Sequence, residues 1–170
     1  DSKVKYYTVQ FVAELQDDAK TVCLFCDDIK KQLFLWNVQT GEHKRFQHHT
    51  VFELSALAAN SRYVVAAYEE FFPSNQSVCM MATDLTTLAT KKLKLTSLSC
   101  ISIALHPTLK YLCIVLESNN TVQVIDLNEM KLLYKITGVL GPHSFRISTD
   151  YYRLISGNTT SIQVWDFGCS

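Results

Sequence analysis

Apolar and polar residues alternate with a period near two along most of the chain, which is the pattern of half-buried β-strands. No stretch holds apolar residues at helical spacing over the length that a helix requires. Each run is short and is bounded by Asp, Asn, Ser, Gly or Lys, which favour turns. The pattern therefore predicts an all-β protein with strands in the ranges 6–15, 22–25, 32–38, 52–57, 63–68, 77–82, 89–95, 100–105, 111–116, 121–127, 132–136, 143–147, 153–155 and 162–167.

A longer pattern recurs four times along the chain. Alignment of residues 33–42, 79–88, 122–131 and 162–169 places Asn37, Asp84, Asp126 and Asp166 in register, with separations of 47, 42 and 40 residues. Before each of these stretches comes a pair of expected strands joined by a short polar turn. The chain is therefore expected to consist of four units, with approximate bounds 1–47, 48–95, 96–138 and 139–170.

A unit of about 40 to 45 residues whose third strand ends in Trp-Asp resembles the WD40 repeat of β-propellers. Trp165 and Asp166 match this ending, Trp36 and Asn37 nearly match it, and the other two units keep the acidic residue. The resemblance implies blade-like antiparallel units of four strands each. Because blades normally close into a ring, it also implies that this chain is one part of a longer propeller.

The repeats depart from the family pattern at several positions. In the family, a Gly-His pair, a Ser or Thr, a turn Asp and the Trp form a buried hydrogen-bonded tetrad. Here His49 and His143 are the equivalents of the family histidine, and neither follows a Gly. The turn position holds Asn119 in the third unit and Thr159 in the fourth. The repeats are therefore degenerate, and a Greek-key β-sandwich is the alternative fold, which would pair distant strands instead of consecutive ones.

The composition is that of a folded domain. The chain is 48% apolar and has 16 basic and 16 acidic residues, so its net charge of zero gives no electrostatic reason to expect nucleic acid or an acidic membrane as partner. No run approaches the roughly 18 apolar residues of a membrane-spanning helix. The first residues show no targeting peptide, and we expect a cytoplasmic protein, with a nuclear location as the alternative.

No pattern typical of catalysis or cofactor binding is present. The acidic pairs Asp17-Asp18 and Asp27-Asp28 are explained by turns, since adjacent side chains on extended chain diverge, and the sequence shows neither a nucleophile with its base nor a phosphate-binding glycine loop. No enzyme activity, catalytic residue or cofactor is therefore expected. Cys23 and Cys26 have a spacing found in zinc and redox sites. On a strand, however, residues three apart point to opposite faces, and no second ligand pair follows, so no metal is expected.

Two sequence features suggest contact with a partner. Residues 91–94, Lys-Lys-Leu-Lys, form the one basic cluster, for which a solvated protective face is favoured over an RNA-binding strip. Residues 69–76 form an unusually long expected turn with two adjacent aromatic residues, which suits an interface core, although the rings could instead fold back on neighbouring turns. The candidate partner-binding residues are Phe71, Phe72, Glu69, Glu70, His48 and His49.

These observations together predict a non-catalytic protein–protein interaction or docking module within a larger protein. The partner is expected to be a protein or another domain of the same chain, without membrane or small-molecule substrate. Two alternatives stay open: an RNA-associated propeller of a processing complex, and a regulatory sensor propeller attached to a nucleotide-hydrolysing signalling domain. Fold resemblance alone is a weak guide to function, because one fold serves many functions.

Overall fold

The computed structural model describes residues 9–15, 18–26, 32–47, 53–72, 75–95, 100–106, 109, 112–117, 120–137, 144–147, 153–157 and 161–166. These residues form strands and turns, with no helix among them, which confirms the all-β prediction. Accordingly, no described helix has the length and apolar character needed to span a membrane. The strands are β1 (Val9–Leu15), β2 (Asp18–Cys26), β3 (Gln32–Asn37), β4 (His43–Gln47), β5 (Glu53–Ala59), β6 (Tyr63–Phe72), β7 (Asn75–Asp84), β8 (Thr90–Lys94), β9 (Cys100–Leu105), β10 (Leu112–Glu117), β11 (Thr121–Asp126), β12 (Lys131–Thr137), β13 (Ser144–Ile147), β14 (Arg153–Gly157) and β15 (Ile162–Asp166).

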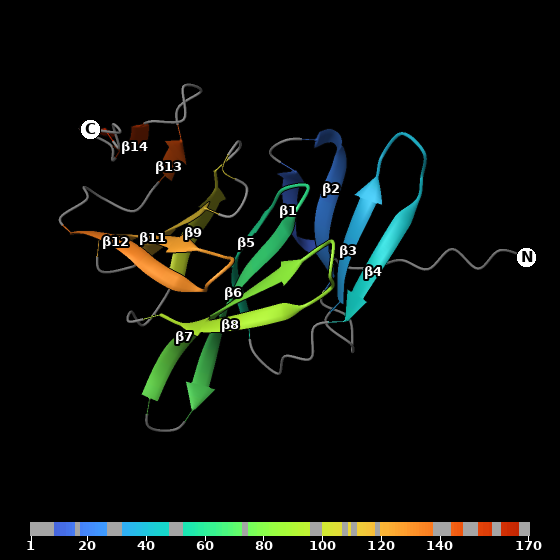
Figure 1. Cartoon of the computed structure of the whole chain (residues 1–170), viewed down its shortest axis with the longest axis horizontal. Coiled ribbons are helices and arrows are strands. Elements are labelled where there is room, and N and C mark those ends of the chain that lie inside the picture. The colour runs from blue at the N-terminus through green and yellow to red at the C-terminus, as the bar shows by residue number, and fades with distance from the viewer. Residues whose placement is uncertain are drawn as a thin grey trace, which may run out of the picture.

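The strands form four antiparallel units in sequence order, which follow one another across the molecule in Figure 1. The first unit is β1–β4, the second β5–β8, the third β9–β12 and the fourth β13–β15. One parallel pair, Leu15 with Ala59, joins β1 to β5. The first strands of the other units also lie beside one another, β5 next to β9 and β9 next to β13.

Within every unit, each strand pairs with the strand that precedes or follows it in the sequence. A Greek-key sandwich would instead pair distant strands in antiparallel fashion, and the one pairing of distant strands among those described is the parallel contact of β1 with β5. The architecture is therefore a series of blade-like sheets of three or four strands.

The core lies between the units, and the sheet of the second unit buries both of its faces against its neighbours. The middle strand β6 shows this directly: Val65 and Ala67 belong to the apolar cluster shared with the third unit, whereas Val64, Ala66 and Tyr68 belong to the cluster shared with the first. Successive residues of a strand point to opposite faces. A strand buried on both faces therefore reads as a continuous apolar run, as residues 63–68 do.

The two end sheets carry exposed apolar residues. Leu33 and Leu35 of β3 pack toward the second unit, so Trp36 lies on the opposite face, where it is 41% exposed. This differs from the buried position that the WD40 resemblance implies for the third-strand tryptophan. The reason is that no described sheet covers that face of the first unit. The fourth unit likewise exposes Ile162 and Val164.

Candidate functional site

Four of the predicted contact residues, Glu69, Glu70, Phe71 and Phe72, lie on the hairpin formed by β6 and β7. Strand β5 accompanies β6 as far as the pair Glu53 with Glu69, and β8 accompanies β7 only from Cys79 onward. Beyond those points β6 and β7 pair with each other alone. They form a two-stranded arm, which consists of residues 70–72 and 75–77 and projects from its sheet at the bottom of Figure 1.

The arm corrects the expectation of a long turn over residues 69–76. Strand β6 continues to Phe72 and β7 begins at Asn75, so the ladder runs through the pairs of Phe71 with Gln76 and Phe72 with Asn75. The apolar run that predicts this strand ends at Tyr68 and is followed by two glutamates, so the strand is expected to end there. The hairpin ladder continues instead, because each rung positions the next and aromatic residues suit extended chain.

The structure places the candidate residues to different extents. Glu69 is half-buried at the base of the arm and has an interaction partner. The backbones of Glu70, Phe71 and Phe72 lie in the arm, but their side chains are outside the described part of the structure. His48 and His49 are outside the described residues altogether, as are the tetrad positions His143, Asn119 and Thr159.

The opposite rim is built from three matching turns, each beginning at a repeat position. In each turn, a side-chain oxygen accepts hydrogen bonds from the backbone N–H groups two and three residues later, an Asx turn. Asp166, the fourth repeat position, ends β15. The bonds run to Asn37 Oδ1 from Gln39 (3.0 Å) and Thr40 (3.0 Å), to Asp84 Oδ1 from Thr86 (2.8 Å) and Thr87 (3.2 Å), and to Asp126 Oδ1 from Asn128 (2.7 Å) and Glu129 (3.3 Å).

Each of these turns closes through a residue with positive φ, four positions after the Asn or Asp. The residues are Gly41 (φ 75°), Leu88 (φ 61°) and Met130 (φ 52°). Glycine adopts this left-handed conformation without steric cost, whereas leucine and methionine adopt it only at a cost in free energy, because their Cβ atoms crowd the backbone. The first unit thus has the favourable residue at a position where the second and third units carry backbone strain.

A pocket of ≈ 230 Å³ lies where the rim turns of the second and third units meet. Asn128 Oδ1 accepts hydrogen bonds from Arg62 Nη2 (3.0 Å) and Tyr63 Oη (2.7 Å), and Lys91 Nζ donates to the Asn128 carbonyl. The Arg62 guanidinium lies 5.1 Å from the Tyr63 ring centroid and 3.6 Å from the Asp84 carboxylate. We refer to these five residues as the inter-unit latch, because their bonds connect two neighbouring sheets.

Protonation states in the latch suit these bonds. Burial raises the pKa of Asp84, but hydrogen bonds from Thr86 and Thr87 and the charge of Arg62 outweigh it, so the pKa lies below its ordinary value. Burial raises the pKa of Tyr63, with the Arg62 charge opposing it and the Asp84 charge adding to it. At neutral pH the carboxylate is therefore ionised and the phenol is a hydrogen-bond donor, as the observed contacts require.

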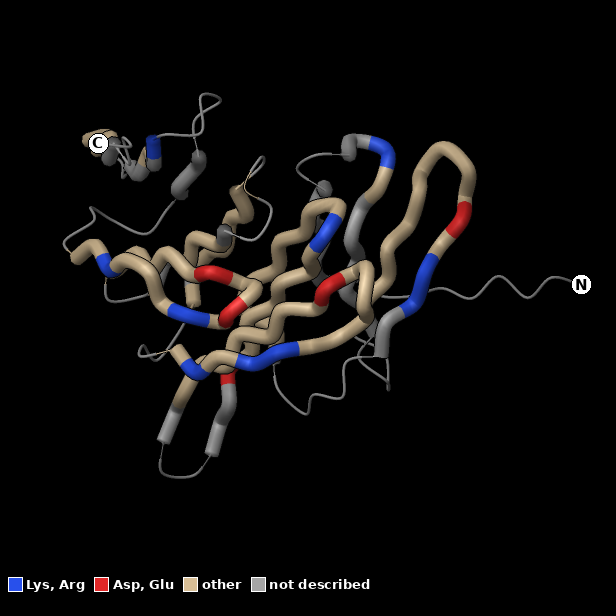
Figure 2. Tube along the Cα trace, viewed as in Figure 1, with Lys and Arg blue, Asp and Glu red and all other residues tan. Residues whose placement is uncertain are grey.

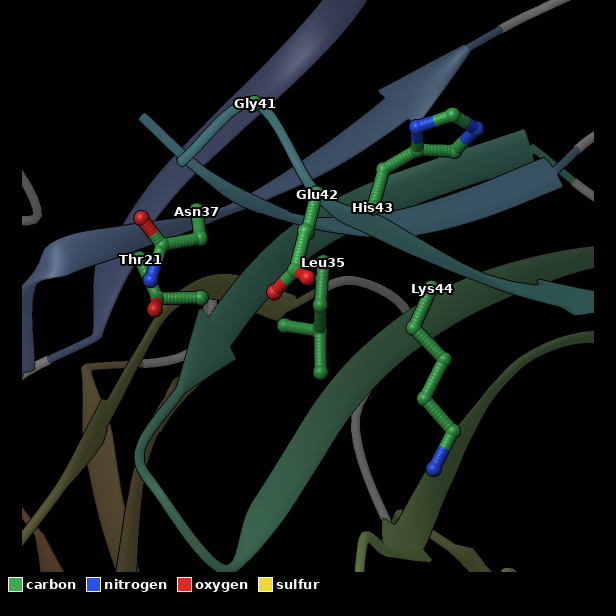
Figure 3. Close-up of a pocket in the computed structure, with 7 residues that line it drawn as sticks. All are labelled: Thr21, Leu35, Asn37, Gly41, Glu42, His43 and Lys44. Atoms are coloured by element: carbon green, nitrogen blue, oxygen red, sulfur yellow. The ribbon is translucent and has the colours of Figure 1, made fainter. Parts of the chain in front are cut away.

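A shallow, open hollow on the first unit gathers polar residues without enclosing a site. Figure 3 shows Glu42 and Leu35 close together, while His43 points away from them. The His43 ring lies 6.3 Å from that of Phe34, across the strand pair. The hollow is lined by Thr21, Leu35, Asn37, Gly41, Glu42, His43 and Lys44.

Three cysteines have described side chains, and none of them forms a disulfide: Cys79, Cys100 and Cys113. The described residues hold no group of three or more His, Cys, Asp or Glu that could bind a metal ion. Burial, and secondarily the Cys100 thiol, raises the pKa of Cys113 well above its ordinary value.

No family model matches this chain, and no curated protein matches it in sequence.

Proposed function

We propose that this chain is a non-catalytic protein–protein docking module, made of WD40-like propeller blades within a larger cytoplasmic or nuclear protein. The sequential four-stranded sheets, with their first strands side by side, support the propeller interpretation. The matching Asx turns at Asn37, Asp84 and Asp126 support a true repeat, because the same side-chain bonds recur at the aligned positions.

The observation that carries the docking function is the projecting arm of β6 and β7. Its last three rungs are flanked by no described strand, and they carry Phe71 and Phe72 beside Glu70. Aromatic residues in a projecting segment with polar neighbours have the composition of an interface core with its rim.

The exposed apolar residues on the end sheets support a place in a larger assembly. The exposed apolar residues are Trp36 on the first unit and Ile155, Ile162 and Val164 on the fourth. In the second and third units, the third strands have their apolar residues mostly buried. Extended apolar surface in a folded protein marks a contact region. Further blades of the same protein would cover these faces, which fits the expectation of a longer propeller.

Site-specific photo-crosslinking tests the docking function. A benzophenone amino acid at position 72 should capture a protein partner in extracts of cells that express the full-length protein. The matched control carries the same probe at Thr86, an exposed residue of the opposite rim. With the captured partner purified, Phe71→Ser combined with Phe72→Ser should weaken binding by roughly thirtyfold or more, the effect of removing an interface hot spot.

Two results would contradict the proposal. One is equal capture from positions 72 and 86, which would show that contact at the arm is not specific. The other is unchanged affinity in the double serine variant while amide exchange in β6 shows that the sheet is intact.

A further inference from the structure

The third strands of the first three units show which face of a sheet turns toward which neighbour. Four places before the repeat position, Leu33 packs against the second unit and Met80 against the third. Met81 and Ile125, at odd distances before the repeat position, pack against the preceding unit instead. Because successive residues alternate between faces, even distances mark the face toward the following unit and odd distances the face toward the preceding one.

The fourth unit exposes the kind of face that elsewhere turns toward a following unit. Ile162 and Val164 lie four and two places before Asp166, and they are 75% and 58% exposed. Ile155 pairs with Val164 and is exposed on the same face; we call these three apolar residues the fourth-unit face. The equivalent residues of the second and third units are buried, with exposed fractions of 0% for Met80, 2% for Ala82, 0% for Val122 and 3% for Val124.

The first unit exposes the opposite kind of face. Trp36 lies one place before Asn37, and Phe34, half-buried, lies three places before it; we call these two residues the first-unit face. Thr83 and Ile125 are the equivalents of Trp36 in the next two units, and both are buried against the preceding sheet or within it. The side chains that border the first-unit face on β4 belong to His43 and Arg45, which pair with Trp36 and Phe34.

The internal junctions select what covers these two faces. Between the first and second units, and again between the second and third, a face of the following kind packs against a face of the preceding kind. The fourth-unit face and the first-unit face are one of each kind. A contact between them therefore repeats an arrangement that the chain already uses twice, whereas two like faces meet at neither of these junctions.

Charge does not oppose such a contact. Strand β3 contains no charged residue, and β15 contains one, Asp166, at its last position. Figure 2 shows β3 in tan beside the basic segment of β4. At the end of the fourth-unit face, Arg153 lies opposite Asp166 in the ladder, so both signs are present there. The two faces are therefore apolar with charge at their borders, which is the composition of an interface core with its rim.

We propose that a second copy of this chain packs head to tail on these faces, with the fourth-unit face of one copy against the first-unit face of the next. The contact is heterologous, because each copy contributes a different surface to it. Trp36 is its aromatic anchor and inserts against the branched side chains of Ile162 and Val164. The further blades that cover these faces then come from a second copy. The β6–β7 arm is not part of either face, so this proposal and the docking function fail independently.

Analytical ultracentrifugation of the chain tests the proposal. The mass of the unmodified chain should rise above that of a monomer as its concentration approaches about 100 µM, because association follows mass action. Combining Ile162→Glu with Val164→Glu should weaken self-association about tenfold or more, since it places two charges in an apolar contact. Trp36→Glu should have the same effect from the other face. All three positions are exposed, and circular dichroism with urea unfolding establishes that each variant is folded.

A mixture of the two variants distinguishes head-to-tail contact from contact between like faces. Each variant keeps one intact face, and the two intact faces are of opposite kinds. Neither variant should self-associate alone, but an equimolar mixture should form a one-to-one complex. If like faces met instead, Trp36→Glu would still self-associate through its intact fourth-unit face, and that result would overturn the proposal.

The matched control is Leu132→Glu with Tyr134→Glu, which adds two charges at exposed apolar positions of the outer strand β12. It should leave self-association within about twofold of the original. An equal loss in this control, or no complex on mixing the two variants, would overturn the proposal. An unmodified chain that stays monomeric at the highest concentration would also overturn it and would assign both faces to other units of a longer protein.

Discussion

Replacement of Asp84 separates the two roles that its carboxylate has in the second unit. One oxygen accepts two backbone hydrogen bonds, and the other lies 3.6 Å from Arg62 Nε. Asp84→Ala removes both roles, whereas Asp84→Asn keeps the amide oxygen that the turn needs. The first unit shows that Asn suffices, because Asn37 makes the same two bonds.

The two variants should differ in the free energy of unfolding. Each hydrogen bond contributes about 0.5–1.5 kcal/mol net, so Asp84→Ala should cost about 1–3 kcal/mol. The ion pair involves a half-exposed Arg62 side chain and is screened by water, so Asp84→Asn should cost less than about 1 kcal/mol. Urea unfolding followed by circular dichroism measures both values, and amide exchange of Thr86 and Thr87 shows the local loss of protection.

The pH dependence follows from the pKa of Asp84, which is lower in the folded chain than its ordinary value of 3.8. A lowered pKa contributes stability above the unfolded-state value, and that contribution is lost as the pH falls through the folded-state value. The stability advantage of the natural chain over Asp84→Asn should therefore be present at pH 7 and shrink below about pH 4. Equal costs for Asn and Ala, or an advantage that grows in acid, would refute this account of the turn.

Four further substitutions or treatments test other parts of the structure. Gly41→Ala should destabilise the chain by about 1 kcal/mol through its positive φ alone, since an added Cβ meets no atom within 4 Å. Leu88→Gly should stabilise the chain by up to about 1 kcal/mol, because glycine relieves the strain of the positive φ at that position. Urea unfolding measures both changes in the free energy of unfolding, and opposite signs would contradict the strain argument. Met80→Ala should cost about 2–5 kcal/mol in the same assay, because this fully buried side chain belongs to the cluster between the second and third units; a cost below about 1 kcal/mol would place that cluster elsewhere. Cys113 should react with a thiol reagent only as fast as the sheet opens, as burial keeps the thiol protonated, and rapid labelling of the folded chain would exclude the buried position.

The sequence pattern indicated the outer strands β8 and β12 and missed the outer strand β4. Strand β4, His-Lys-Arg-Phe-Gln, lies outside every expected range because Phe46 is its one apolar residue and the residues on either side of it are polar. Alternation cannot be recognised from a single apolar position, so such a strand leaves no signal. The pairing of β4 with β3 supplies what its own sequence does not indicate.

The repeat alignment found the correct turn positions but not the reason for them. Asn37, Asp84 and Asp126 were aligned by their spacing and proved to accept equivalent backbone hydrogen bonds. The positive φ at Leu88 and Met130 had no sequence signal, because neither residue is typical of turns. Position in the turn, fixed by the flanking strand pairs, imposes that conformation.

The inter-unit latch could not be predicted from any local pattern. Arg62 and Asn128 are 66 residues apart in the chain and meet because the second and third units pack face to face. Each residue alone is typical of a polar turn. Only the packing of whole sheets brings such turns together, which is why spacing within one unit could not reveal the contact.

Hydroxyl-radical footprinting of Phe71 and Phe72 in the free protein tests the docking account most directly. The same chain offers two references for aromatic oxidation: Tyr68, fully buried in the same strand, and Tyr134, which is 66% exposed. With rates normalised to intrinsic reactivity, the account predicts that at least one phenylalanine is oxidised nearly as fast as Tyr134 and becomes protected when the partner binds. Oxidation of both rings as slow as that of Tyr68 in the free protein would contradict it, because buried rings cannot form the centre of an interface.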